Sequence, residues 1–217
     1  MSTCSIVPLP YCPNPAEYFS RIRHAPGAVL LDSGRPMAER GRFDVLSAWP
    51  LEQLLPASQE TGAEFLTRCR ASLVRLGEAQ LPAGYELPFA GGLLGYLGYD
   101  FGRRLEPLPT GAIDDLQLPD ARLGLYGWAV MTDHQLRTTQ LMCHPSVDET
   151  EQQRLMALFS AEPATEQPTF QLTSPFKADL APEDYRAAFT RIQAYIQAGD
   201  CYQVNFAQRF QAGFQGD

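Results

Sequence analysis

The sequence predicts an α+β fold in which an N-terminal β-sheet or β-sandwich subdomain with flanking helices precedes the opening of a second domain. Three observations favour this fold class. Apolar residues recur at helical spacing in several segments, and β-rich runs dominate from Phe89 onward. Eighteen prolines and seventeen glycines are spread through the 217 residues, so most elements should be short. A final helix and strand follow a polar stretch that has little to bury.

The first domain is expected to span residues 1–160. In the segment Glu64–Leu76, Phe65, Cys69 and Leu73 lie four residues apart and define one apolar face, which predicts an amphipathic helix. Shorter patterns before it predict three further elements: a helix at 14–23 and strands at 28–31 and 43–48.

The rest of this domain should be rich in strands. Two β-rich runs, at 123–131 and 137–143, are joined by the turn-forming segment 132–135, which predicts a hairpin. A polar-faced helix is expected at 149–159. We expect two β-rich layers with helices outside them, around a core that includes Leu30, Leu31, Phe43, Leu94, Leu125, Trp128 and Val130.

Glycines recur in the run Gly91–Gly102. The run lacks both G-x-G-x-x-G and the Gly-Lys-Ser/Thr ending of a phosphate-binding loop. Glycines at Gly92, Gly95 and Gly98, with aromatic residues between them, favour a strand that another backbone approaches closely.

Residues 161–180 are expected to be a linker, and residues 181–217 the start of a second domain. Pro182 in the first turn and Gly199 at the end are typical of helix boundaries. A strand is expected at 201–210, with Gln203 and Asn205 on its non-aromatic face. The strand pattern is equally compatible with a solvated edge and with two amides directed into a pocket. Because one helix and one strand do not make a domain, we expect this one to be truncated.

The composition limits the function classes. Lys and Arg number 17 and Asp and Glu 25, giving a formal net charge of −8, so the long-range attraction that draws proteins to nucleic acids is lacking. No apolar stretch is long enough for a transmembrane helix, and residues 1–5 do not resemble a secretory signal. The five cysteines are scattered without a C-x-x-C pair, which is typical of reduced thiols. We expect a cytoplasmic protein without nucleic-acid or membrane partners.

The residues alone assign no reaction. His24, His134 and His144 are not paired with Cys or carboxylates at metal-ligand spacing, so no metal site is expected in this chain. Ser33 does not lie in G-x-S-x-G, so a hydrolase nucleophile is not indicated.

Three strings together resemble a known family. They are LLDSG at 30–34 with RFD at 42–44, GGLLGYLGYDFGRRLE at 91–106 with Leu108-Pro109, and GDCYQVNFAQRF at 199–210. Their order and spacing resemble the chorismate-utilising family that contains component I of aminodeoxychorismate synthase and of anthranilate synthase. Gly98 and the string CYQVN at 201–205 resemble the aminodeoxychorismate branch. The resemblance extends from about Tyr18 to the last residue.

The resemblance implies an activity for a complete protein. That activity is the amination of chorismate to 4-amino-4-deoxychorismate for 4-aminobenzoate and folate synthesis, with ammonia from a glutamine amidotransferase partner. It also implies Mg²⁺ and a nucleophilic lysine, both held by the family's C-terminal half. We therefore expect residues 1–217 to lack catalytic residues and turnover. The alternatives are anthranilate synthase component I, or a regulatory module that binds an aromatic amino acid without catalysis.

The resemblance further implies a tryptophan-type pocket. The matching residues here are Ser33, Arg40, Gly41, Arg42 and Phe43, with Tyr202 and Asn205 from the second domain. Leu31, Phe43 and Tyr202 would supply apolar walls for an indole, and Ser33 and the backbone near Gly41 polar contacts. From turn chemistry alone, Ser33 and Gly34 would simply direct the chain out of a strand.

Overall fold

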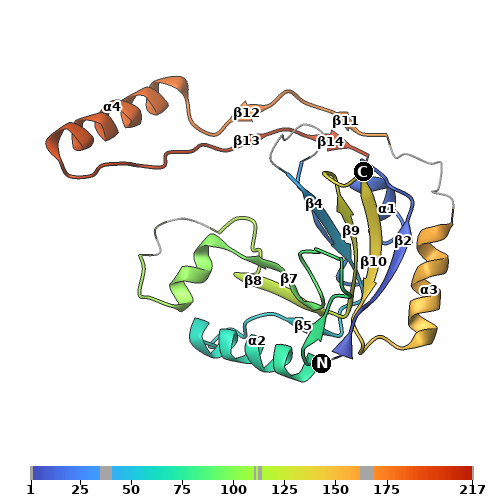
Figure 1. The fold of residues 1–217 in the computed structure, drawn as a ribbon. Helices are drawn as coiled ribbons and strands as arrows, with labels where there is room; N and C mark the ends of the chain where they lie inside the picture. The colour runs from blue at the N-terminus through green and yellow to red at the C-terminus, as the bar shows by residue number, and fades with distance from the viewer. Residues whose placement is uncertain (1, 35–40, 110, 112–113, 162–168, 217) are drawn as a thin grey trace. The chain divides into compact units, whose positions relative to one another are not determined.

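The computed structural model describes residues 2–34, 41–109, 111, 114–161 and 169–216 (Figure 1). It divides into two compact units, Met1–Ala164 and Thr165–Asp217, which we describe separately. The predicted linker at 161–180 includes residues 162–168, which lie outside the described residues, and the predicted domain limits stay a prediction.

Two antiparallel sheets form the centre of the first unit. The larger has the strand order β2 (Ser5–Leu9), β10 (Thr138–Cys143), β9 (Trp128–Asp133), β4 (Phe43–Ser47) and β3 (Val29–Leu31). The smaller has the order β5 (Glu52–Leu54), β8 (Ala121–Tyr126) and β7 (Gly92–Leu97). In addition, the short strands β1 (Ser2–Thr3) and β6 (Ala79–Gln80) form a separate parallel pair.

Helices lie on the outer faces of both sheets, as predicted (Figure 1). On the five-stranded sheet, α1 (Pro15–Phe19) and α3 (Glu149–Ser160) contribute Tyr18, Leu155 and Phe159 to a core shared with the strands. On the three-stranded sheet, α2 (Gly62–Leu76) and the 3₁₀-helix η1 (Tyr99–Arg104) pack Phe65 and Phe101 edge to face.

The alternation of strand side chains separates the two main cores. In β9, Trp128 and Val130 point to the helices α1 and α3, whereas Ala129 and Met131 join Leu94 and Tyr126 between the sheets. Leu94, Leu125, Trp128 and Val130 are buried as predicted. Leu30 and Phe43 are half-buried, but Leu31 is 43% exposed because it ends β3, the edge strand of its sheet.

Local signals account for the boundaries of the longer helices. Thr61 and Glu64 form a reciprocal capping box at the start of α2, and Asp148 caps α3 through the backbone N–H of Glu151. The first helix is shorter than the predicted 14–23: Asn14 caps it, and regular helix ends at Phe19.

The β-rich run predicted at 123–131 forms strand on both sides of Gly127, and the predicted hairpin with 137–143 is confirmed by the antiparallel pairing of β9 and β10, but the run is divided between two sheets. The chain changes sheets at Gly127, so that β8 pairs with β5 and β7 while β9 pairs with β4 and β10. A Cβ at Gly127 would lie 2.9 Å from Val147 Cγ2, so the crossing is tightly packed.

The close backbone approach predicted for the glycine run is confirmed. A Cβ at Gly95 would lie 2.1 Å from the carbonyl oxygen of Arg122 on β8.

The second unit contains the predicted helix, α4 (Pro182–Ala198), which ends at Gly199 in the left-handed conformation. The predicted strand at 201–210 is wrong, because regular pairing begins only at Phe210. There, β13 (Phe210–Gln211) pairs with β12 (Lys177–Ala178), and β14 (Phe214–Gln215) pairs with β11 (Gln171–Leu172). Alternation alone does not make a strand, since strand residues need a partner for their backbone hydrogen bonds. The packing of this segment on the N-terminal sheet stays a prediction.

Candidate functional site

The candidate site lies where the chain leaves β3 and enters β4. These two strands are antiparallel neighbours, with Leu31 opposite Val45, so their connected ends lie side by side. The backbone N–H of Gly34 donates to Asp32 Oδ1 at 2.6 Å, which forms a local turn. The backbone N–H of Ser33 donates to Asp44 Oδ1 at 2.8 Å and ties this turn to β4. The turn expected from the sequence at Ser33 and Gly34 is therefore present, and it is anchored.

Gly41 packs directly against Ser33. A Cβ at Gly41 would lie 2.4 Å from the Ser33 carbonyl oxygen and 2.8 Å from Ser33 Oγ, so no larger residue fits without a shift of the backbone. Ser33 Oγ is buried and has no hydrogen-bond partner among the residues that the structure describes. An unsatisfied buried hydroxyl costs about 1–3 kcal/mol, which a polar group of a ligand would offset.

Arg42 and Phe43 lie next to this turn. The Arg42 guanidinium lies over the Phe43 ring, with Cζ 4.5 Å from the ring centroid. It also binds Asp133 at the end of β9, with Nε and Nη2 at 3.0 and 2.8 Å from Oδ2. Burial opposes the ionisation of Asp133, but Arg42 and the backbone N–H groups of two following residues outweigh it and hold the pKa of this carboxyl below its usual value.

A buried pair that sequence reasoning missed supports the turn from below. Asp44 is 2% exposed, and its Oδ2 lies 2.6 Å from His134 Nε2. The other ring nitrogen of His134 lies 3.2 Å from the hydroxyl of Tyr11. Asp44 shares a strand face with the buried Leu46, and a carboxylate on an apolar face was the available signal.

The positions of the other predicted pocket residues relative to this turn are not determined. Arg40 lies outside the described residues. Tyr202 and Asn205 belong to the second unit, where Tyr202 is 93% exposed and Gln203 Nε2 donates to Asn205 Oδ1 at 3.4 Å. Their part in a pocket stays a prediction, and the strand on which both alternatives for Gln203 and Asn205 depended is not formed.

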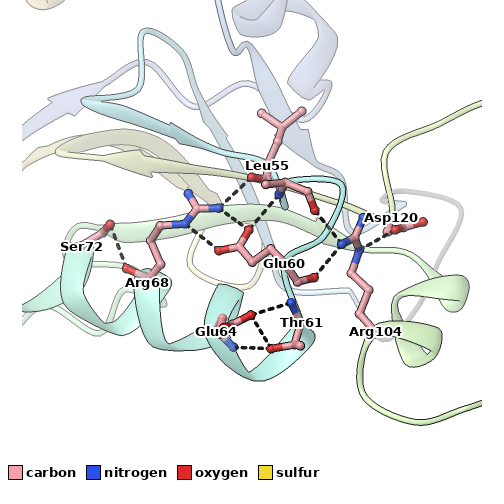
Figure 2. A network of polar contacts seen from close by, with 9 residues as sticks. Leu55, Glu60, Thr61, Glu64, Arg68, Ser72, Arg104 and Asp120 are labelled. Atoms are coloured by element: carbon pink, nitrogen blue, oxygen red, sulfur yellow. Dashed lines mark hydrogen bonds and ion pairs between the residues drawn. The ribbon is translucent and has the colours of Figure 1, made fainter.

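A second polar cluster surrounds the start of α2 (Figure 2). Arg68 binds both carboxylate oxygens of Glu60 at 2.9 and 2.8 Å and the carbonyl of Leu55 at 2.8 Å. Arg104 binds Asp120 at 2.6 Å and the carbonyls of two residues in the loop before α2. The bonds from Arg68 lower the pKa of Glu60 to about 2. Because its groups bond mainly to one another and to backbone, this cluster is best explained as a clamp on the loop between β5 and α2.

A metal-dependent or lysine-dependent reaction needs particular groups in a suitable setting. Within the part of the chain that the structure describes, no three His, Cys, Asp or Glu side chains are placed to hold a metal ion. Lys177, the single lysine of the sequence, is exposed on β12, whereas a nucleophilic lysine needs a desolvated setting. None of the helices in the described residues has the length and hydrophobicity needed to cross a membrane.

Comparisons with known proteins place these observations in context. Residues 28–217 match a family model described as chorismate binding enzyme. Over the whole chain, 39% of residues are identical to aminodeoxychorismate synthase component 1 of Klebsiella aerogenes, and the match covers 49% of that protein. Identity to anthranilate synthase component 1 of Mycobacterium tuberculosis H37Rv is 29%, over 90% of this chain and 43% of the relative.

A solved structure shares the fold. The crystal structure of anthranilate synthase component I from Streptococcus pneumoniae TIGR4 superposes with a TM-score of 0.61 at 21% identity, covering 87% of this chain and 45% of that one. The chain thus spans about half the length of the relatives it matches.

Proposed function

Because the chain belongs to the family of chorismate binding enzymes, we propose that it forms part of component 1 of an aminodeoxychorismate synthase. The carrying observation is the 39% identity to that component over the whole chain, against 29% to anthranilate synthase component 1. The reaction proposed for the complete protein is the amination of chorismate to 4-amino-4-deoxychorismate. The ammonia would come from a glutamine amidotransferase subunit, and the product would serve 4-aminobenzoate and folate synthesis in the cytoplasm.

The described residues do not fit the Mg²⁺ ion that the resemblance implies. They contain no group of carboxylates or histidines with metal-ligand geometry, and Lys177 lacks a desolvated setting. We therefore assign no metal ligand and no catalytic step to residues 1–217. What the chain supplies in this proposal is a binding and supporting domain, and residues 1–217 alone are expected to turn over no chorismate.

The experiment is a product analysis of the complete gene product that contains residues 1–217. It is incubated with chorismate, Mg²⁺ and ammonium, and the products are separated by chromatography. The proposal predicts 4-amino-4-deoxychorismate as the product. Anthranilate as the product would assign the chain to the other branch of the family, and the absence of any aminated product would reject the proposal.

A tryptophan-type pocket at Ser33 is the second part of the proposal. Its support is the buried Ser33 hydroxyl without a described partner, next to the bare backbone of Gly41 and the half-buried ring of Phe43. An amino acid could offer its ammonium or carboxylate to the hydroxyl and its ring to Phe43. Leu31, exposed at the end of β3, would add apolar surface. If the chain binds an aromatic amino acid but its gene product aminates nothing, the reading as a regulatory module stands instead.

A further inference from the structure

A continuous series of hydrogen bonds links four polar groups from separate segments to the turn at Ser33. The Tyr11 hydroxyl lies 3.2 Å from His134 Nδ1, and His134 Nε2 lies 2.6 Å from Asp44 Oδ2. Asp44 Oδ1 accepts the backbone N–H of Ser33 at 2.8 Å. The side chains of Asp44 and His134 are only 2% and 5% exposed, so water does not replace these bonds.

The chemistry of the carboxylate determines the direction of each bond. Both oxygens of an ionised carboxylate only accept, so His134 must donate from Nε2 while Ser33 donates from its backbone. A neutral histidine that carries its proton on Nε2 has a lone pair on Nδ1, which accepts the Tyr11 hydroxyl. A hydroxyl group both donates and accepts, so the Tyr11 bond is satisfied whether or not Nδ1 carries a proton, and each group in this series has a hydrogen-bond partner.

Stability alone does not require this pair. Asp44 lies on the strand face that carries Leu46, beside an apolar core, and replacing both partners of a buried hydrogen bond by apolar groups of the same shape can be nearly neutral or stabilising. An apolar residue at position 44 would, however, remove the acceptor for the Ser33 N–H. The distinctive consequence of Asp44 is thus the fixed position of the Ser33 backbone, whose hydroxyl belongs to the pocket proposed above.

We propose that Asp44 and His134 are positioning residues, which hold Ser33 in the orientation that the ligand pocket needs. The inference rests on the proposed pocket for its purpose, but not for its mechanism. Neither residue is expected to touch the ligand, since both side chains are almost fully buried. Tyr11 completes the series by bonding to the second ring nitrogen of His134.

The test compares three variants of the chain. His134→Phe keeps a ring but removes the donor to Asp44. His134→Gln restores an amide N–H at the position of Nε2 and serves as the rescue. Thr132→Val is the matched control for a change beside Asp44, because Thr132 is buried in β9 opposite Asp44 of β4 and its hydroxyl bonds only to Thr139 among the described contacts, at 2.9 Å. The two readouts are the hydrogen-exchange rate of the Ser33 amide without ligand, and the dissociation constant for L-tryptophan.

The expected result is an increase of about tenfold or more in Ser33 amide exchange in His134→Phe, near wild-type exchange in His134→Gln, and no specific change in Thr132→Val. Tryptophan should bind more weakly to His134→Phe than to the wild type, and with near wild-type affinity to His134→Gln and Thr132→Val. If exchange changes as expected but the wild type binds no tryptophan, the positioning stands and the ligand of the proposed pocket is wrong. Equal exchange at Ser33 in His134→Phe and Thr132→Val overturns the inference. Should His134→Phe fail to fold, Tyr11→Phe replaces it, with a smaller increase in exchange expected and no increase contradicting the inference.

Discussion

Arg42 and Asp133 form an ion pair that joins the start of β4 to the end of β9. Arg42 Nη2 lies 2.8 Å from Asp133 Oδ2, and the Asp133 side chain is only 3% exposed. Its second oxygen accepts the backbone N–H groups of Gln135 and Leu136 at 2.8 and 3.0 Å. The same carboxylate thus shapes the β9–β10 turn and holds the residue that precedes Phe43, so the ends of three strands share one anchor.

This anchor should weaken in acid. Although burial opposes it, the bonds from Arg42 and the two N–H groups hold the pKa of Asp133 below its ordinary value of 3.8. A carboxyl whose pKa is lower in the folded than in the unfolded protein stabilises the folded state fully above its unfolded-state pKa. This contribution is lost as the pH falls through its folded-state pKa. Urea unfolding between pH 7 and pH 3 should therefore show a loss of free energy below about pH 4 that is smaller in Asp133→Asn. Identical pH dependence in both proteins would contradict this assignment.

Gly41→Ala should disrupt the turn at Ser33. The new Cβ would meet the Ser33 carbonyl oxygen at 2.4 Å, and a backbone atom cannot rotate away as a side chain can. We expect a loss of about 1–3 kcal/mol in the free energy of unfolding, measured with urea. Gly102→Ala is the control, since its Cβ would find its nearest neighbour at 3.5 Å. Equal stability of the two variants would show that Gly41 is not confined as described.

Gly95→Ala should be more damaging still. Gly95 has a φ of +145°, which alanine rarely adopts, and its Cβ would lie 2.1 Å from the Arg122 carbonyl oxygen. Backbone strain and steric overlap together should lower the free energy of unfolding by about 2–4 kcal/mol. Calorimetry should therefore show a lower melting temperature for Gly95→Ala than for Gly102→Ala. A wild-type melting temperature would be incompatible with the close pairing of β7 and β8.

The cysteines should differ sharply in reactivity. Burial raises the pKa values of Cys4, Cys12 and Cys69, and raises that of Cys143 to about 11. Cys201 is the partly exposed member of the five. Because the thiolate is the reactive form, a disulfide reagent at pH 8 should modify Cys201 rapidly and the others only on unfolding. Cys201→Ser should abolish the fast phase, and a fast phase that persists would refute this prediction.

The parts of the fold that local patterns determine were predictable. The helix α2 follows from the spacing of Phe65 and Cys69 and from the Thr61–Glu64 capping box, which act within a few residues. The change of sheets at Gly127 was not predictable, because β8 and β9 follow one another in a single β-rich run and only tertiary packing assigns them to different sheets. The strand expected at 201–210 shows the reverse error, in which alternation is present but the described residues offer pairing only from Phe210 onward.

The candidate site divides in the same way. Ser33, Gly41, Arg42 and Phe43 could be named because their strings resemble those of a family, and the structure brings them together at the ends of β3 and β4. The bond between His134 and Asp44 joins residues 90 positions apart, so no local pattern contains it. A buried acid on an apolar strand face was the one signal available, and it does not identify its partner.

The most direct test of the pocket at Ser33 is isothermal titration calorimetry with L-tryptophan. The wild type should release or absorb heat with saturation at or below millimolar concentration. Ser33→Ala and Phe43→Ala should each weaken binding about tenfold or more, as expected for the loss of a buried polar contact or an aromatic wall. Gly102→Ala, remote from the site, should bind like the wild type. If millimolar tryptophan produces no heat and no increase in the melting temperature of the wild type, the assignment of the pocket at Ser33 is wrong.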